Sequence, residues 1–135
     1  MGSLLLTRFT SVSAQQADAI KGVCVNTDKD LKMEFSQTGS VFNGRIVWSA
    51  NMYDADGKTL KKDVNNERQE LKSRPILDRV IFSGLSYSDG QWTGGGLYDP
   101  GGGKTYKCKI RLKSGVLQIR GYAGIFGKTT EWTRN

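Results

Sequence analysis

The stretch TYKCKIRLK, residues 105–113, alternates apolar and basic side chains along its length. Because successive side chains of a β-strand point to opposite faces of the sheet, this period of two predicts a strand with one face in the core and one in water. The two expected rows are Tyr106, Cys108, Ile110 and Leu112 on the inner face, and Lys107, Lys109, Arg111 and Lys113 on the outer face.

Other segments of the chain carry comparable strand patterns, and short turns containing Asp, Ser or Gly separate most of them. The 17 glycines and only 2 prolines also favour strands and tight turns over a helical bundle. We therefore expect an all-β protein of about eight strands. Besides residues 105–113, the predicted strands are residues 20–27, 31–37, 41–50, 76–88, 91–99, 116–124 and 127–134.

One long segment, residues 51–75, breaks this rhythm because it is polar and charged. It can hold at most a short helix around residues 66–71, and it is long enough to arch over one end of a barrel. When consecutive hairpins each have one apolar face, closing the sheet into a barrel buries all of these faces in its interior. The sequence thus predicts a single up-and-down antiparallel barrel over residues 20–135, with a long loop or short helix at residues 51–75.

The N-terminal residues 1–19 are expected to lie outside the barrel domain. A short apolar run leads to Val12-Ser13-Ala14, which has the small residues that a signal peptidase requires. We interpret this segment as the remnant of a secretory signal or tag with a flexible N-terminus, which predicts a periplasmic or secreted bacterial protein. The alternative is a disordered tail or a short first helix. The apolar run is too short to span a membrane.

Several classes of catalytic and cofactor site are disfavoured by the sequence. The chain has no histidine, which removes the common catalytic triads and most catalytic zinc sites. The glycine run of residues 98–106 begins with Tyr98 where a P-loop requires glycine, and a predicted strand follows where a helix is needed. Residues 54–63 lack the ligand spacing of a calcium loop. We therefore predict no catalytic residue, metal or cofactor.

The barrel interior is the main candidate binding site, because an eight-stranded barrel is just wide enough to be filled by side chains or to hold one small molecule. Three polar residues are candidates for the mouth, where they would meet a carboxylate. A packed core remains the alternative for the interior positions. The interior candidates are Phe42, Ile46, Trp48, Trp92, Tyr98, Tyr106 and Ile110, and the mouth candidates are Arg45, Arg120 and Tyr122.

The leading functional hypothesis is a non-enzymatic protein that binds a small apolar or amphipathic molecule. The net charge of +7 supports a second functional hypothesis. In this alternative the barrel is filled, and its basic outer face recognises an anionic envelope polymer or a protein partner. Nucleic acid is not expected as a partner, because export and the apolar placement of the aromatic residues argue against it. The sequence leaves open the oligomeric state and whether Cys24 and Cys108 form a disulfide or stay as buried thiols.

From about residue 20 to the end, the chain resembles a bacterial secreted family, domain of unknown function 2147. The blocks Tyr-Asp-Pro-x-x-Gly-Lys-x-Tyr and Arg-Gly-Tyr-x-Gly are the most specific part of this resemblance. The matching segments are NGRIVW (43–48), DVNN (63–66), LKSRPIL (71–77), GQWTGGGLYDPGGGKTYKCKI (90–110), LQIRGYAG (117–124) and WTR (132–134).

The resemblance implies a lipocalin-like barrel and export, and it supplies no activity. It also implies a Gly-x-Trp motif on the first strand, with the tryptophan packed at the closed end of the barrel near a C-terminal arginine. This chain has Cys24 at the tryptophan position, after Gly22 and Val23. We therefore expect Arg134 to lack that stacking partner and the closed end to be less well packed.

Overall fold

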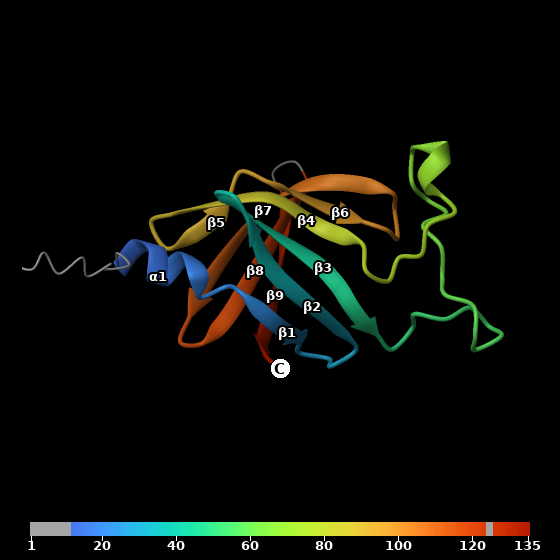
Figure 1. Cartoon of the computed structure of the whole chain (residues 1–135), viewed down its shortest axis with the longest axis horizontal. Helices are drawn as coiled ribbons and strands as arrows, with labels where there is room; N and C mark the ends of the chain where they lie inside the picture. The colour runs from blue at the N-terminus through green and yellow to red at the C-terminus, as the bar shows by residue number, and fades with distance from the viewer. Residues whose placement is uncertain (1–11, 124–125) are drawn as a thin grey trace, which may run out of the picture.

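The alternating pattern forms nine antiparallel strands and two short helical segments in the computed structural model, which describes residues 12–123 and 126–135. One helix lies at the N-terminal end of the barrel and one short turn of helix lies in the long loop (Figure 1). The elements are α1 Val12–Asp18, β1 Gly22–Asn26, β2 Leu31–Thr38, β3 Val41–Ser49, the 3-10 helix Gln69–Leu71, β4 Val80–Ser88, β5 Gln91–Thr93, β6 Gly96–Asp99, β7 Lys104–Lys113, β8 Val116–Ala123 and β9 Phe126–Arg134.

The strands form a closed, lipocalin-like, eight-stranded barrel with one extra strand, as the sequence predicts. Successive strands pair with each other, and the pairing of β1 with β9 closes the circle. The extra strand arises because the predicted strand 91–99 is interrupted at Gly94-Gly95, so that β5 and β6 each pair with both β4 and β7. A Cβ at position 95 would lie 2.1 Å from the Ser83 carbonyl oxygen, so only glycine fits this close approach.

The core lies inside the barrel and consists of inward side chains from every strand of the wall. Its members are large and nearly inaccessible, which is the condition under which apolar burial stabilises a fold most. The fully buried apolar side chains include Cys24, Met33, Phe35, Phe42, Leu85, Trp92, Ile110 and Leu117.

Helix α1 covers one end of the barrel, which we call the closed end (Figure 1). The Trp92 indole N–H donates a hydrogen bond of 3.1 Å to the Ala17 carbonyl oxygen, and the Tyr87 hydroxyl donates one of 3.3 Å to the Gln16 side chain. Residues 12–18 form a short first helix, which the sequence analysis gave beside a disordered tail as an alternative to a signal remnant. The apolar run before it lies outside the described residues.

At the closed end, the buried Cys24 stands where the first-strand motif has a tryptophan, and Arg134 makes hydrogen bonds there to backbone carbonyl oxygens. Cys24 occupies a fully buried position, and Ile20 is buried beside it in the same core. Arg134 donates hydrogen bonds to the carbonyl oxygens of Ala19 and Ile20, so it ties β9 to the end of the helical segment. Both cysteines are free and buried, and burial raises the pKa of each thiol to about 11.

The opposite end, which we call the mouth, carries residues 50–79, the loop between β3 and β4 (Figure 1). This 50–79 loop has the position that the sequence predicts for residues 51–75, and its 3-10 helix falls within the predicted range of residues 66–71. The loop contacts the β6–β7 turn, where the Asn65 side chain donates to the carbonyl oxygens of Pro100 and Gly101 at 3.2 and 3.0 Å.

Candidate functional site

A cavity of about 320 Å³ opens into the barrel at the mouth. Its wall is apolar because the inward positions of the strands carry aliphatic and aromatic side chains here. This volume lies within the range of small-molecule sites, roughly 300–1,000 Å³. The lining residues include Leu31, Met33, Ile46, Ile81, Phe82, Leu97, Ile119 and Trp132.

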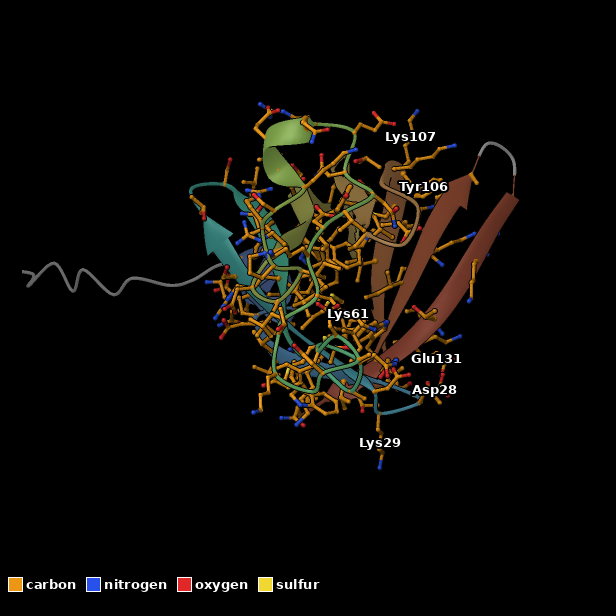
Figure 2. All side chains as sticks on the ribbon, turned by 90° about the vertical axis from the view of Figure 1, so that its right-hand side faces the viewer. Asp28, Lys29, Lys61, Tyr106, Lys107 and Glu131 are labelled. Carbon is orange, nitrogen blue, oxygen red and sulfur yellow. The ribbon has the colours of Figure 1, made fainter. Side chains whose placement is uncertain are left out.

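A second cavity of about 410 Å³ continues from the first toward the ends of β8 and β9. The two cavities share Leu97, Asp99, Gly121 and Lys128 as lining residues, so they form one cleft, which we call the mouth cleft. The absence of a side chain at Gly121 helps to keep the cleft open, since a Cβ there would lie 3.3 Å from a Leu97 methyl group. Figure 2 looks onto this end of the barrel and labels Tyr106 beside the cleft.

Lys128 is the cation of the mouth cleft. It lies on β9, where residues 128, 130 and 132 all line the cleft. Among the described residues Lys128 has no salt-bridge partner, because the observed ion pairs involve other cations. The carboxylate of Asp99 is engaged in its own turn, where it accepts a hydrogen bond of 2.9 Å from the Gly101 amide. An ammonium group without a protein partner therefore lies at the edge of an apolar cleft.

A buried polar cluster fastens the 50–79 loop to the rim of the cleft. Asp63 is 1% exposed, and its carboxylate accepts hydrogen bonds from the Tyr98 hydroxyl at 2.7 Å and from the Asn66 amide at 2.9 Å. Burial raises the pKa of Tyr98 to about 12, and the hydrogen bond to Asp63 contributes to the rise. The same loop packs on Gly103, where a Cβ would lie 1.7 Å from the Asn65 carbonyl oxygen.

The structure brings three of the predicted interior residues to the mouth cleft. Ile46 lines its deeper part, Tyr106 lines its outer part, and Tyr98 lies at the rim. On β6 the inward position belongs to Leu97, which pairs with Tyr106. Gly94-Gly95 shifts the alternation by one residue between β5 and β6, so the inward parity of Trp92 does not extend to Tyr98.

Three other predicted interior residues are buried in the core, and one of them, Trp92, also borders a separate hollow of about 490 Å³ at the closed end. Phe42, Trp92 and Ile110 are at most 2% exposed, and none of them lines the mouth cleft. Trp92 lies instead under α1, with its ring centroid 4.9 Å from that of Tyr87. A ligand in the cleft would not contact these three side chains unless the core rearranged.

The expected inward position of Trp48 is wrong, because a β-bulge changes the parity of β3. Met33 pairs with Ile46 and Lys32 pairs with Trp48, which leaves Val47 as the extra residue. Trp48 consequently shares the outer face with Lys32, whose ammonium nitrogen lies 5.5 Å from the indole centroid.

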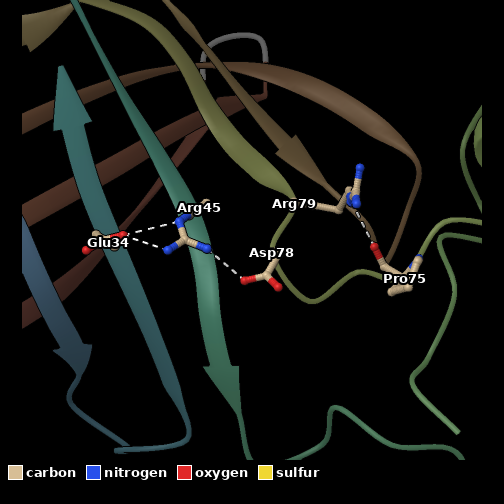
Figure 3. Close-up of polar contacts among 5 residues, drawn as sticks. All are labelled: Glu34, Arg45, Pro75, Asp78 and Arg79. Carbon is tan, nitrogen blue, oxygen red and sulfur yellow. Dashed lines mark hydrogen bonds and ion pairs between the residues drawn. The ribbon is translucent and has the colours of Figure 1, made fainter. Parts of the chain in front are cut away.

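Arg45 does not reach the mouth cleft either, because it faces outward from β3 into two carboxylates. Its guanidinium donates to Glu34 on β2 and to Asp78 at the end of the 50–79 loop, with distances of 2.8 Å to each (Figure 3). The neighbouring Arg79 donates to the Pro75 carbonyl oxygen at 2.9 Å. Arg45 thus links the barrel wall to the loop, and its guanidinium group is already paired with two carboxylates.

The two remaining mouth candidates lie on β8. Arg120 faces outward, which corrects its expected place at the mouth, and its guanidinium carbon lies 5.2 Å from the Tyr122 ring centroid. Tyr122 lines both the outer part of the mouth cleft and a hollow on the outer surface.

Sequence reasoning missed Leu97, Gly121 and Lys128. Alternation along β9 was the available signal for Lys128, since it shares a parity with Trp132.

The described residues contain no group of three or more metal-ligating side chains. Within the same residues, no helix is both long enough and apolar enough to cross a membrane. The chemistry that the site displays is therefore apolar contact in the cleft, with the Lys128 ammonium group, the Asp99 carboxylate and several hydroxyl groups at its edge.

Comparison with known proteins agrees with this architecture. The solved structure of HP1028 from the human pathogen Helicobacter pylori, described as belonging to the lipocalin family, superposes with a TM-score of 0.72 at 25% sequence identity. The match covers 86% of this chain and 82% of that one. The fold is thus that of a lipocalin-like barrel, a class that suggests a binding protein.

The sequence itself identifies the family. Residues 22–134 match the family described as an uncharacterized protein conserved in bacteria, DUF2147, so the chain belongs to that family. A comparison with curated proteins finds no match.

Proposed function

We propose that this protein is an exported, non-enzymatic binding protein that holds a small amphipathic molecule in the mouth cleft. The observation that carries the proposal is the pair of adjoining, mostly apolar cavities at the mouth, which share Leu97 and Gly121 in their linings. Burying ligand surface against such a wall contributes roughly 25 cal/mol per Å² of apolar area. The lipocalin-like fold supports a binding role.

Lys128 supports an anionic head group on the ligand. An apolar tail would lie against Ile46 and Ile119, and the carboxylate or similar group would meet the ammonium group at the edge. Because Lys128 is exposed, its contribution is that of a surface ion pair, about 0.2–1 kcal/mol. The tail therefore supplies most of the affinity and the head group sets the orientation.

The N-terminal segment supports export. The bonds that tie this segment to the barrel include those from Gln16, Ala17 and Ala19, which lie beyond the possible cleavage point after Ala14. Cleavage there would leave these contacts in the mature protein. N-terminal sequencing of protein secreted by a bacterial host tests this point, and a mature protein that starts at Gln15 is expected. A mature exported protein that keeps residues before Gln15 would contradict it.

The binding role is tested with a titration of dodecanoate and of a fluorescent apolar probe. Leu97→Trp places a larger side chain where the two cavities meet, and we expect it to weaken binding by at least about tenfold. Leu112→Trp is the matched control, because it makes the same change at an exposed position of β7 that does not line the cleft. Equal affinities in both variants and the unchanged protein would refute binding in the cleft.

A second pair of ligands tests the head group. Lys128→Gln should weaken dodecanoate binding up to about fivefold, the equivalent of a surface ion pair, and leave dodecanol binding unchanged. The alcohol has the same tail and no charge, so it serves as the control for the apolar part. An equal loss for both ligands would show that Lys128 acts on the shape of the cleft and not on a charge.

A further inference from the structure

A second hollow, of about 210 Å³, lies on the outer face of the barrel, over β7, β8 and β9. Apart from Tyr122, which borders both, its lining residues differ from those of the mouth cleft, because they point to the opposite side of the same strands. Every side chain around it is polar or carries a polar group, and three are cations. This outer hollow is lined by Lys109, Arg111, Gln118, Arg120, Tyr122 and Thr129.

The cations of the outer hollow repel one another when no anion is bound. Lys109 on β7 lies directly opposite Arg120 on β8, and like charges in directly opposed positions destabilise a sheet. Arg111 is the diagonal neighbour of Arg120, at a Cβ separation of roughly 7–8 Å. Among the described residues none of the three takes part in a salt bridge. A bound anion would relieve this repulsion.

Both guanidinium groups are held in position by neighbouring side chains. Arg120 donates a hydrogen bond of 2.9 Å to the Thr129 hydroxyl and lies over Gly127, where a Cβ would come within 2.7 Å of its Nε. With the Gln91 amide oxygen turned toward Arg111, that oxygen accepts from the guanidinium at 3.1 and 2.7 Å. Two oriented forks on either side of a lysine form a preorganised group of donors.

These groups favour a phosphate over a carboxylate. Each guanidinium fork pairs best with two oxygen atoms, so two forks and an ammonium group call for more acceptors than the two oxygens of one carboxylate. The Tyr122 and Gln118 side chains add further donors at the border. Glu131 pairs with Gln118 in the sheet, and its carboxylate does not line the hollow.

We propose that the outer hollow is a phosphate-binding site, with Arg111, Arg120 and Lys109 as its ligands. The phosphate belongs either to a soluble phosphate ester or to an anionic lipid head group, and the chemistry of recognition is the same for both. This site is independent of the mouth cleft, so neither proposal depends on the other.

The first experiment measures binding of glycerol phosphate at constant ionic strength, with sedimentation on phosphatidylglycerol vesicles as the second arm. Arg111→Lys keeps the charge and removes the fork, and we expect about a tenfold loss of affinity. Lys113→Gln is the control, because it removes one charge from the same row of β7 outside the hollow. We expect it to lower vesicle binding by no more than about fivefold and glycerol phosphate binding hardly at all.

The two arms separate the sources of the phosphate. Binding in the glycerol phosphate arm indicates a soluble ester, and binding to phosphatidylglycerol vesicles alone indicates a lipid. Either result supports the site if Arg111→Lys reduces it more than Lys113→Gln. Equal losses in the two variants, or no binding in either arm, would overturn the proposal. Tighter binding of a single-stranded oligonucleotide than of either phosphate ligand would also overturn it.

A stability measurement distinguishes a binding role from a structural one. Lys109→Gln should leave the melting temperature without phosphate unchanged or higher, because it removes a like-charge pair. The same variant should lose most of the increase in melting temperature that glycerol phosphate gives the unchanged protein. A lower melting temperature without phosphate, together with an intact increase on adding it, would overturn the assignment. Leu97→Trp should retain that increase, which keeps this test separate from the one on the mouth cleft.

Discussion

The closed end and the mouth of this barrel are built from the same strands, but large side chains occupy the interior at the closed end, where a hollow of about 490 Å³ lies beside α1, whereas at the mouth an apolar cavity opens into the barrel. At the closed end, Trp92 and Phe42 fill the interior and α1 covers it. At the mouth, the inward positions include Gly121 and Thr130, and the cover is a polar loop. The size of the inward side chains, rather than the backbone topology, therefore decides where the barrel can accept a ligand.

The covers of the two ends are also attached differently. The α1 segment is held by hydrogen bonds from Trp92, Tyr87 and Arg134 and by apolar packing of Ile20. The 50–79 loop is held by a buried carboxylate, by Asn65 and by the Arg45–Asp78 ion pair. Apolar packing is insensitive to pH and salt, whereas polar attachments respond to both. The mouth is consequently the end whose cover can be loosened without unfolding the barrel.

The largest expected effect is at the closed end. Trp92→Ala removes the most buried large side chain and its bond to Ala17, and we expect it to lower the free energy of unfolding by about 3–5 kcal/mol. Urea denaturation measures this loss. Leu97→Ala, at a half-buried position beside the cleft, should cost clearly less. If the two variants lost the same stability, the contrast between a filled and a hollow end would not hold.

Alkaline pH should destabilise the barrel over two successive ranges. Burial raises the pKa of Cys24 and Cys108 from 9.0 to about 11, and that of Tyr98 from 10.0 to about 12. The unfolded chain therefore releases these protons at lower pH than the folded chain, so stability falls as pH rises, from pH 9 to 11 for the thiols and from pH 10 to 12 for Tyr98. The free energy of unfolding, measured at pH 8, 10 and 11.5, should decrease stepwise. A flat profile would contradict the burial of these groups.

A smaller effect is expected at the attachment of the loop. Tyr98→Phe leaves the buried Asp63 carboxylate with one hydrogen bond fewer, which we expect to cost about 1–3 kcal/mol. Hydrogen exchange should show faster opening of the 50–79 loop, with α1 unaffected. The variant should also show a shallower loss of stability above pH 10. Equal acceleration of exchange at both ends would mean that the two covers open together.

The smallest effect should come from Arg45→Ala. Its ion pairs with Glu34 and Asp78 are more than a third exposed, and such pairs contribute roughly 0–1 kcal/mol. Thermal unfolding at low salt should show a slightly lower melting temperature than that of the unchanged protein, and the difference should shrink in 1 M salt. A difference that salt does not change would show that Arg45 acts through packing of its aliphatic part.

Much of the fold could be predicted from the sequence because alternation is a local property. The stretch of residues 105–113 forms β7, in which Tyr106, Cys108 and Ile110 take the predicted inner row, whereas Leu112 near the end of the strand is exposed. The polar segment at residues 51–75 lies in the loop at the mouth. The candidate site was harder to predict from the sequence, because its residues are placed by breaks in that alternation. The bulge at Val47 turns Trp48 outward, and the Gly94-Gly95 break gives Leu97 the inward position in place of Tyr98.

Contacts between distant segments could not be predicted at all. Asp63 and Tyr98 are 35 positions apart, and nothing in their local patterns pairs them. The same is true of Arg134, which replaces the expected tryptophan contact with bonds to the end of the α1 segment. Whether a barrel interior is hollow depends on how these long-range contacts place each inward side chain, because one methyl group more or less decides a void.

The most direct test is native mass spectrometry of the protein purified without removal of lipids, followed by extraction under denaturing conditions. If the mouth is hollow and holds a ligand, we expect a discrete adduct with one small molecule, which the Leu97→Trp variant should lose and the Leu112→Trp variant should keep. A clean mass of the protein alone, together with no uptake of dodecanoate or of the fluorescent apolar probe, would show that the mouth is as filled as the closed end.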